Sequence, residues 1–78
     1  MKTGQQKKRR AQAVDLCLTE MHREIADAAR LAKQAKHALR DGIVGRAFDV
    51  ALEIEEHLHL ANRAIQAAAL LKPRSKRP

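Results

Sequence analysis

The chain has 78 residues, with 16 Lys and Arg against nine Asp and Glu, which gives a formal net charge of +7 at pH 7. It contains one Phe, no Trp or Tyr, three Gly and two Pro. This length allows at most one small domain, and the near absence of aromatic residues excludes a β-sandwich. A composition rich in Ala and Leu predicts an all-α fold.

No stretch of the sequence approaches the roughly 18 apolar residues of a membrane span, so we expect no membrane partner. Asp15 and Glu20 follow the basic start before any apolar run typical of a secretory signal can form. Cys17 is the single cysteine, and a lone thiol is typical of a reducing compartment. We therefore expect a cytoplasmic protein.

The first ten residues, MKTGQQKKRR, are polar and basic. The four consecutive positive charges at positions 7–10 repel one another, and no apolar helix face starts before Ala11. We therefore expect a basic N-terminal tail over residues 1–10, frayed or partly helical, followed by a helix over about 10–40. The alternative is a helix that begins as early as Gly4, because Thr3 and Gln6 have capping-box spacing.

The expected first helix has apolar residues at alternating steps of four and three, the spacing of a helix packed along one partner. Its predicted seam consists of Val14, Leu18, Met21, Ile25, Ala28, Ala32, Ala35 and Leu39. Acidic and basic residues three apart on the outer surface, Glu20–Arg23 and Asp27–Arg30, are expected to pair.

A turn over residues 41–43 separates the two helices. Gly42 is expected in the left-handed conformation that ends many helices, followed by the apolar Ile43. Neither Ile43 nor Val44 has a side-chain oxygen or nitrogen that accepts a backbone hydrogen bond, so we predict a poorly capped start for the next helix.

The second helix is predicted over about 44–72, because Pro73 cannot continue it. Its seam repeats the alternation of the first: Val44, Ala47, Ala51, Ile54, Leu58, Ala61, Ile65 and Ala68. Residues 73–78 form a basic C-terminal tail. Since the connection is short, the two helices must run antiparallel, and 11–72 form one helical hairpin.

A two-helix hairpin has only one internal interface, and a single core below about 70–80 residues rarely supplies more than about 3–5 kcal/mol. Both helices also carry apolar residues outside their seams, and exposed apolar patches normally mark an association surface. We therefore predict self-association into a four-helix bundle, with a homodimer favoured. The predicted oligomer interface consists of Leu18, Met21, Ile25, Phe48, Ile54, Leu58 and Ile65.

Positive charge is concentrated at the two ends of the chain, whereas residues 11–71 are slightly acidic. An antiparallel hairpin brings the ends together, and clustered Lys and Arg bind phosphate backbones without reading sequence. The predicted nucleic-acid-binding residues are Lys7, Lys8, Arg9, Arg10, Lys72, Arg74, Lys76 and Arg77. The alternative is that these ends only keep an Ala-rich bundle soluble.

A second cluster combines acids and histidines in the middle of the second helix, where Glu53 and His57 share a face. If Ile25 packs opposite Leu58, Glu24 of the first helix comes near His57. Di-iron bundles require Glu-x-x-His on each of two helices, and the sequence does not supply this set on both. We therefore expect no metal ion and no cofactor.

These patterns predict a small non-enzymatic accessory or regulatory protein that binds nucleic-acid backbone, DNA or RNA, through its basic ends. The alternative function is a protein–protein interaction adaptor or inhibitor, of the type encoded by phages or mobile elements. That alternative would use an apolar flank around Phe48, Leu52, Leu60 and Leu71.

Overall fold

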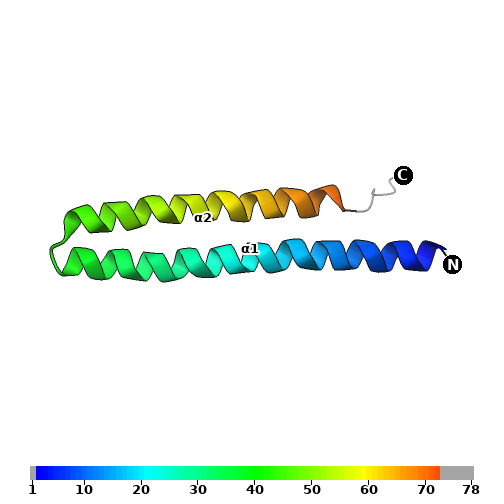
Figure 1. Cartoon of the computed structure of the whole chain (residues 1–78), viewed down its shortest axis with the longest axis horizontal. Coiled ribbons are helices and arrows are strands. Elements are labelled where there is room, and N and C mark those ends of the chain that lie inside the picture. Colours follow the sequence, from blue (N-terminus) through cyan, green and yellow to red (C-terminus); the bar gives the residue numbers. More distant parts are fainter. Residues whose placement is uncertain (1, 73–78) are drawn as a thin grey trace, which may run out of the picture.

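The computed structural model of the protein describes residues 2–72 and consists of two long helices joined by a tight turn (Figure 1). Helix α1 comprises Lys2–Arg40 and helix α2 comprises Val44–Leu70. The two helices run antiparallel and lie side by side along the length of α2, and the described residues contain no strand. The expected all-α helical hairpin is confirmed.

Helix α1 begins well before the position near residue 10 that the charge pattern suggested, so most of the basic N-terminal segment is helical. Lys, Arg and Gln have high helix propensity, and each residue added to an existing helix gains a backbone hydrogen bond. Because α1 has 39 residues and α2 has 27, the start of α1 projects beyond the end of α2 (Figure 1). Arg74, Lys76 and Arg77 of the expected C-terminal tail lie outside the described residues.

The turn closes α1 as its sequence predicted. Gly42 has a φ of +80°, in the left-handed region. The Ile43 N–H donates to the carbonyl of Ala38 at 2.8 Å, and the Gly42 N–H donates to the carbonyl of Leu39 at 3.0 Å. These two bonds form a Schellman motif, which satisfies carbonyls that the helix end leaves free.

Helix α2 begins at Val44 with no side-chain hydrogen bond at its N-cap residue, Ile43, in agreement with the predicted poor cap. At the other end, the backbone N–H of Leu71 donates to the carbonyl of Ala68 at 3.0 Å. The helix therefore ends at Leu70, three positions before Pro73, which has no N–H with which to continue it.

The two helices pack along a core seam that repeats every seven residues. In α1 the core seam consists of Val14, Cys17, Met21, Glu24, Ala28, Leu31, Ala35 and Ala38. In α2 it consists of Ala47, Val50, Ile54, His57, Ala61, Ala64, Ala68 and Leu71. All sixteen are buried or half-buried, and their small average size allows the backbones to approach closely.

At every second position, the core seam differs from the predicted seams. Val14, Met21, Ala28 and Ala35 belong to both the predicted and the observed seam of α1. Each of the other predicted positions is replaced by the residue immediately before it in the sequence. Leu31 replaces Ala32, for example, and Ala38 replaces Leu39. The same shift of one residue occurs in α2. Each helix has an apolar stripe three positions wide, so either edge of the stripe satisfies the alternating spacing.

Candidate functional site

The basic end of the hairpin combines cations from both ends of the described chain. Lys7 and Arg10 of α1 and Lys72 after α2 line one open groove of about 860 Å³. All three side chains are exposed. The convergence expected from an antiparallel hairpin therefore occurs for these residues, which lie more than 60 positions apart in the sequence.

Lys8 and Arg9, the other two cations of positions 7–10, are also exposed. They lie on the segment of α1 that projects past α2 (Figure 1). Successive residues of a helix point about 100° apart, so the four cations at positions 7–10 surround the helix. Asp15 is the one acidic residue that lines the groove. We call Lys7, Lys8, Arg9, Arg10 and Lys72 the basic end.

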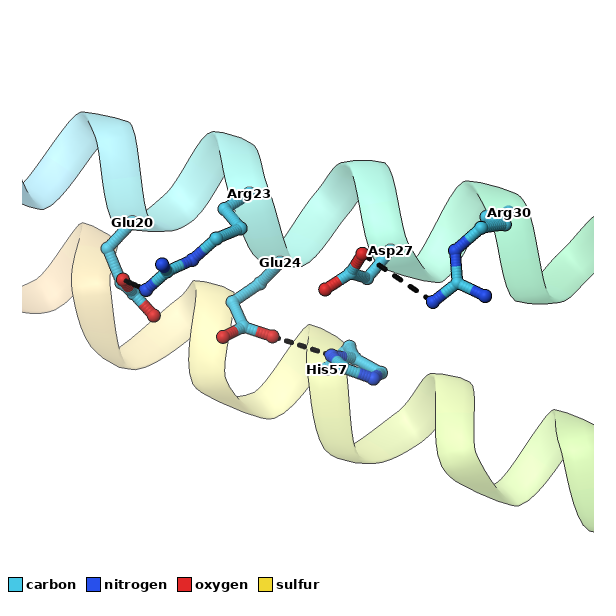
Figure 2. A network of polar contacts seen from close by, with 6 residues as sticks. All are labelled: Glu20, Arg23, Glu24, Asp27, Arg30 and His57. Carbon is cyan, nitrogen blue, oxygen red and sulfur yellow. Dashed lines mark hydrogen bonds and ion pairs between the residues drawn. The ribbon is translucent and has the colours of Figure 1, made fainter.

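A polar layer interrupts the core seam near its middle. Figure 2 shows Glu24 of α1 and His57 of α2 pointing toward each other across the helix–helix interface. His57 Nδ1 lies 2.6 Å from Glu24 Oε1, and the Glu24 residue is buried with only 8% of its surface exposed. The pairing predicted for Glu24 and His57 is therefore present, although His57 pairs across the hairpin rather than with Glu53 of its own helix.

The hydrogen bond from His57 lowers the pKa of the Glu24 carboxyl below its ordinary value of 4.5. Burial acts in the opposite direction, because removal from water disfavours the charged form. Glu24 is thus a carboxylate at neutral pH. A shift of one helix along the other would leave this carboxylate facing apolar residues, so the polar layer fixes the register of the hairpin.

Asp27 lies beside this pair. Glu24, Asp27 and His57 each offer one oxygen or nitrogen atom that could bind a metal ion, and these atoms lie within 4.8 Å of one another. The sequence predicted Asp27 only as the partner of Arg30, although its position three residues after Glu24 places it on the same side of α1. Asp27 also pairs with Arg30, at 3.6 Å.

The surrounding ion pairs are those expected from their spacing. Arg23 pairs with Glu20, and Arg30 pairs with Asp27 (Figure 2). Both arginines are exposed and both acids are half-buried. Glu56 and His59 have the Glu-x-x-His spacing of di-iron bundles, but both side chains are exposed rather than directed into the core seam. Among the described residues, no buried side-chain nitrogen or oxygen lacks a hydrogen-bond partner, so Glu24 and His57 satisfy each other in the polar layer.

One side of the hairpin is an apolar stripe that the core seam leaves uncovered. We call this stripe the apolar face: Leu18, Ile25, Ala32 and Leu39 of α1, with Val44, Ala51, Leu58 and Ile65 of α2. All eight residues are exposed. Residues seven apart share a helix face, and Leu18 and Ile65 line the same groove, so both halves of the apolar face lie on one side.

The residues predicted at the oligomer interface divide into two groups. Met21 and Ile54 are half-buried within the core seam of the hairpin itself. Leu18, Ile25, Leu58 and Ile65 belong to the apolar face, and Phe48 is exposed beside it.

The apolar flank proposed for an adaptor does not form a single surface. Phe48 and Leu52 are 68% and 65% exposed, whereas Leu60 and Leu71 are half-buried. At about 100° per residue, Leu60 lies about 120° around α2 from Phe48, and Leu71 lies beyond the last residue of the helix. An adaptor would have to use the apolar face instead.

Comparisons with known protein families, with curated proteins and with solved structures found no match to this chain. Within the described residues, neither helix is long and apolar enough to cross a membrane.

Proposed function

We propose that the protein is a non-enzymatic accessory protein that binds the phosphate backbone of nucleic acid through its basic end. The observation that carries the proposal is the convergence of Lys7, Arg10 and Lys72 around one open groove. Each cation that contacts a phosphate releases counterions from the nucleic acid, and this release drives binding.

The helical form of the N-terminal segment supports this proposal. A helix fixes the relative positions of the cations at 7–10, so less conformational freedom is lost on binding than from a flexible tail. The described residues of the basic end include no aromatic side chain, and base-stacking proteins depend on such residues. Binding should therefore be insensitive to sequence.

Fluorescence anisotropy with a labelled DNA duplex and a labelled RNA hairpin, repeated over a series of salt concentrations, tests the proposal. The triple variant Lys7→Gln, Arg10→Gln, Lys72→Gln removes the three groove cations. If each contacts one phosphate, the slope of log affinity against log salt becomes shallower by about 2.7.

A matched control removes the same number of charges from the middle of the hairpin: Lys33→Gln, Lys36→Gln, Arg63→Gln. These three side chains are exposed and belong to neither end. The control should keep the wild-type slope. Equal losses in the two triple variants would mean that net charge alone attracts the nucleic acid, and the proposed site would be rejected.

We further propose that the hairpin self-associates into a four-helix bundle. The apolar face supports this, because Ile25, Leu39 and Leu58 each remain 42–58% exposed and lie in one continuous stripe. Sedimentation velocity over a range of protein concentrations tests it directly. A chain that stays monomeric while binding a different protein through this face would instead be an adaptor.

A further inference from the structure

The accessible surface of the hairpin is larger than that of a compact monomer of the same mass. Its accessible area is 6547 Å² for 8.7 kDa, whereas a compact monomer of this mass exposes about 4,700 Å². The surplus of about 1,800 Å² reflects the elongated shape of the two-helix hairpin (Figure 1), and the eight exposed residues of the apolar face lie along one side of it. A second copy on that side would bury them, and a stable interface buries roughly 800 Å² on each partner.

The apolar face is organised in rows, each with one residue from each helix. The hydrogen bond between Glu24 and His57 shows how the two helices are aligned. Ile25 follows Glu24 in α1 and Leu58 follows His57 in α2, so Ile25 and Leu58 form one row of the apolar face. Steps of seven residues from this row give the others. In order from the basic end toward the turn, the rows are Leu18–Ile65, Ile25–Leu58, Ala32–Ala51 and Leu39–Val44.

Two arrangements of a face-to-face dimer satisfy two-fold symmetry. In the first arrangement, the turns of the two chains lie at the same end of the dimer, and each row packs against the same row of the other chain. The Ile25–Leu58 row then packs large residues on large ones, and the Ala32–Ala51 row leaves a gap. When the turns lie at opposite ends, the Ile25–Leu58 row of each copy meets the Ala32–Ala51 row of the other.

The two outer rows pack large residues on large ones in either arrangement. With opposite polarity the two inner rows pack large residues on small ones, so no Ala row faces another Ala row and the interface fills more evenly. The charge distribution favours the same arrangement. Turns at the same end would bring two basic ends together, including two copies of Lys7, Arg10 and Lys72, whereas turns at opposite ends separate them by about 60 Å, given the rise per residue of α1. Shape and charge therefore select one polarity.

We infer that a second copy of the chain docks on the apolar face with opposite polarity, so that the dimer has one basic end at each pole. The inference depends on the self-association proposed above, and it adds a function if the basic end binds nucleic acid as proposed. A dimer with two separated phosphate-binding poles holds two duplex segments at once. A dimer with adjacent basic ends would present a single larger site to one duplex.

Disulfide trapping distinguishes the two polarities. All variants carry Cys17→Ala, because Cys17 is half-buried in the core seam and must not compete. With opposite polarity, the two-fold axis crosses α1 between Ile25 and Ala32. Exposed Ala29 then lies next to its own copy, within the short Cα separation that a disulfide requires. Ala29→Cys should therefore form a covalent dimer by itself in a glutathione redox buffer.

The matched control is a mixture of Ala32→Cys and Ala51→Cys chains, each in the same background. These two positions face each other between copies only if the turns lie at the same end. Cross-linking of this mixture, without cross-linking of Ala29→Cys, would overturn the inference while leaving self-association intact. A chain that sediments as a monomer at every concentration would overturn both.

Two further experiments test the dimer: substitutions in the apolar face, and an assay for the joining of two duplexes by one dimer. Ile25→Glu with Leu58→Glu should abolish dimerisation, whereas Leu52→Glu, at an exposed position outside the apolar face, should not. The wild-type protein should bring two differently labelled duplexes together in a pull-down, and the double variant should bind each duplex without joining them. A cross-linked Ala29→Cys dimer that binds duplex but never joins two would overturn the two-pole function.

Discussion

Replacement of Leu31 by Ala should be the most costly single truncation in the hairpin. Leu31 has only 6% of its surface exposed and lies in the core seam. Loss of a buried leucine side chain costs about 2–5 kcal/mol in well-packed cores. Because the hairpin surrounds this residue on one side only, we expect about 2–3 kcal/mol, which is a large part of the stability available to so small a core.

The control is Leu52→Ala. Leu52 is 65% exposed on α2, so its truncation should change the unfolding free energy by less than about 0.5 kcal/mol. Leu and Ala both have high helix propensity, so the difference between the two variants reports burial. Urea denaturation followed by circular dichroism at 222 nm, at protein concentrations below those that favour a dimer, measures both.

Leu39→Ala decides between the observed and the predicted seams. Leu39 belongs to the predicted seam but is 58% exposed in the hairpin. At low concentration its truncation should cost much less than that of Leu31. If Leu39→Ala costs more than Leu31→Ala under these conditions, the packing of α1 against α2 described above is wrong.

Two further predictions concern the turn and the polar layer. Gly42→Ala should cost about 1–2 kcal/mol in a thermal or urea melt, because its φ of +80° is unfavourable for a residue with a Cβ; Gly45→Ala should instead stabilise by up to about 1 kcal/mol, since an added Cβ meets no atom within 4 Å at either site. Equal effects of the two would contradict the turn geometry. Because the folded-state pKa of Glu24 is lowered, its contribution is complete above the ordinary value of 4.5 and is lost as the pH falls below it. Urea midpoints between pH 6 and pH 3 should therefore fall more steeply for the wild type than for Glu24→Gln, and parallel curves would exclude Glu24 as the cause.

Much of the fold follows from local patterns in the sequence. Gly42 predicts the end of α1, because few other residues adopt a positive φ without strain. Pro73 limits α2, and a three-residue connection requires antiparallel helices. The alignment of the helices could also be predicted from the sequence. The assumption that Ile25 packs opposite Leu58 placed Glu24 near His57, and the structure has these two side chains in contact.

The candidate site was predictable only in part. Convergence of Lys7 and Lys72 follows from the hairpin itself. The helical state of residues 2–10 does not, because charge repulsion and helix propensity act in opposite directions and their balance is not visible in a pattern. The proximity of half-buried Asp27 to the polar layer was not predicted, because it depends on the position of His57 on α2.

The sequence by itself determined two helices, their direction and an apolar stripe three positions wide on each. Only the tertiary structure decided which edge of the stripe becomes the core seam. The choice depends on both helices at once: Leu31 and Val50 enter the seam together, and Glu24 enters it because His57 arrives opposite to satisfy its charge. The rejected edge, with Ile25 and Leu58, becomes the apolar face. Periodicity along one helix cannot distinguish these edges, because the free energy that separates them comes from contacts between the two helices.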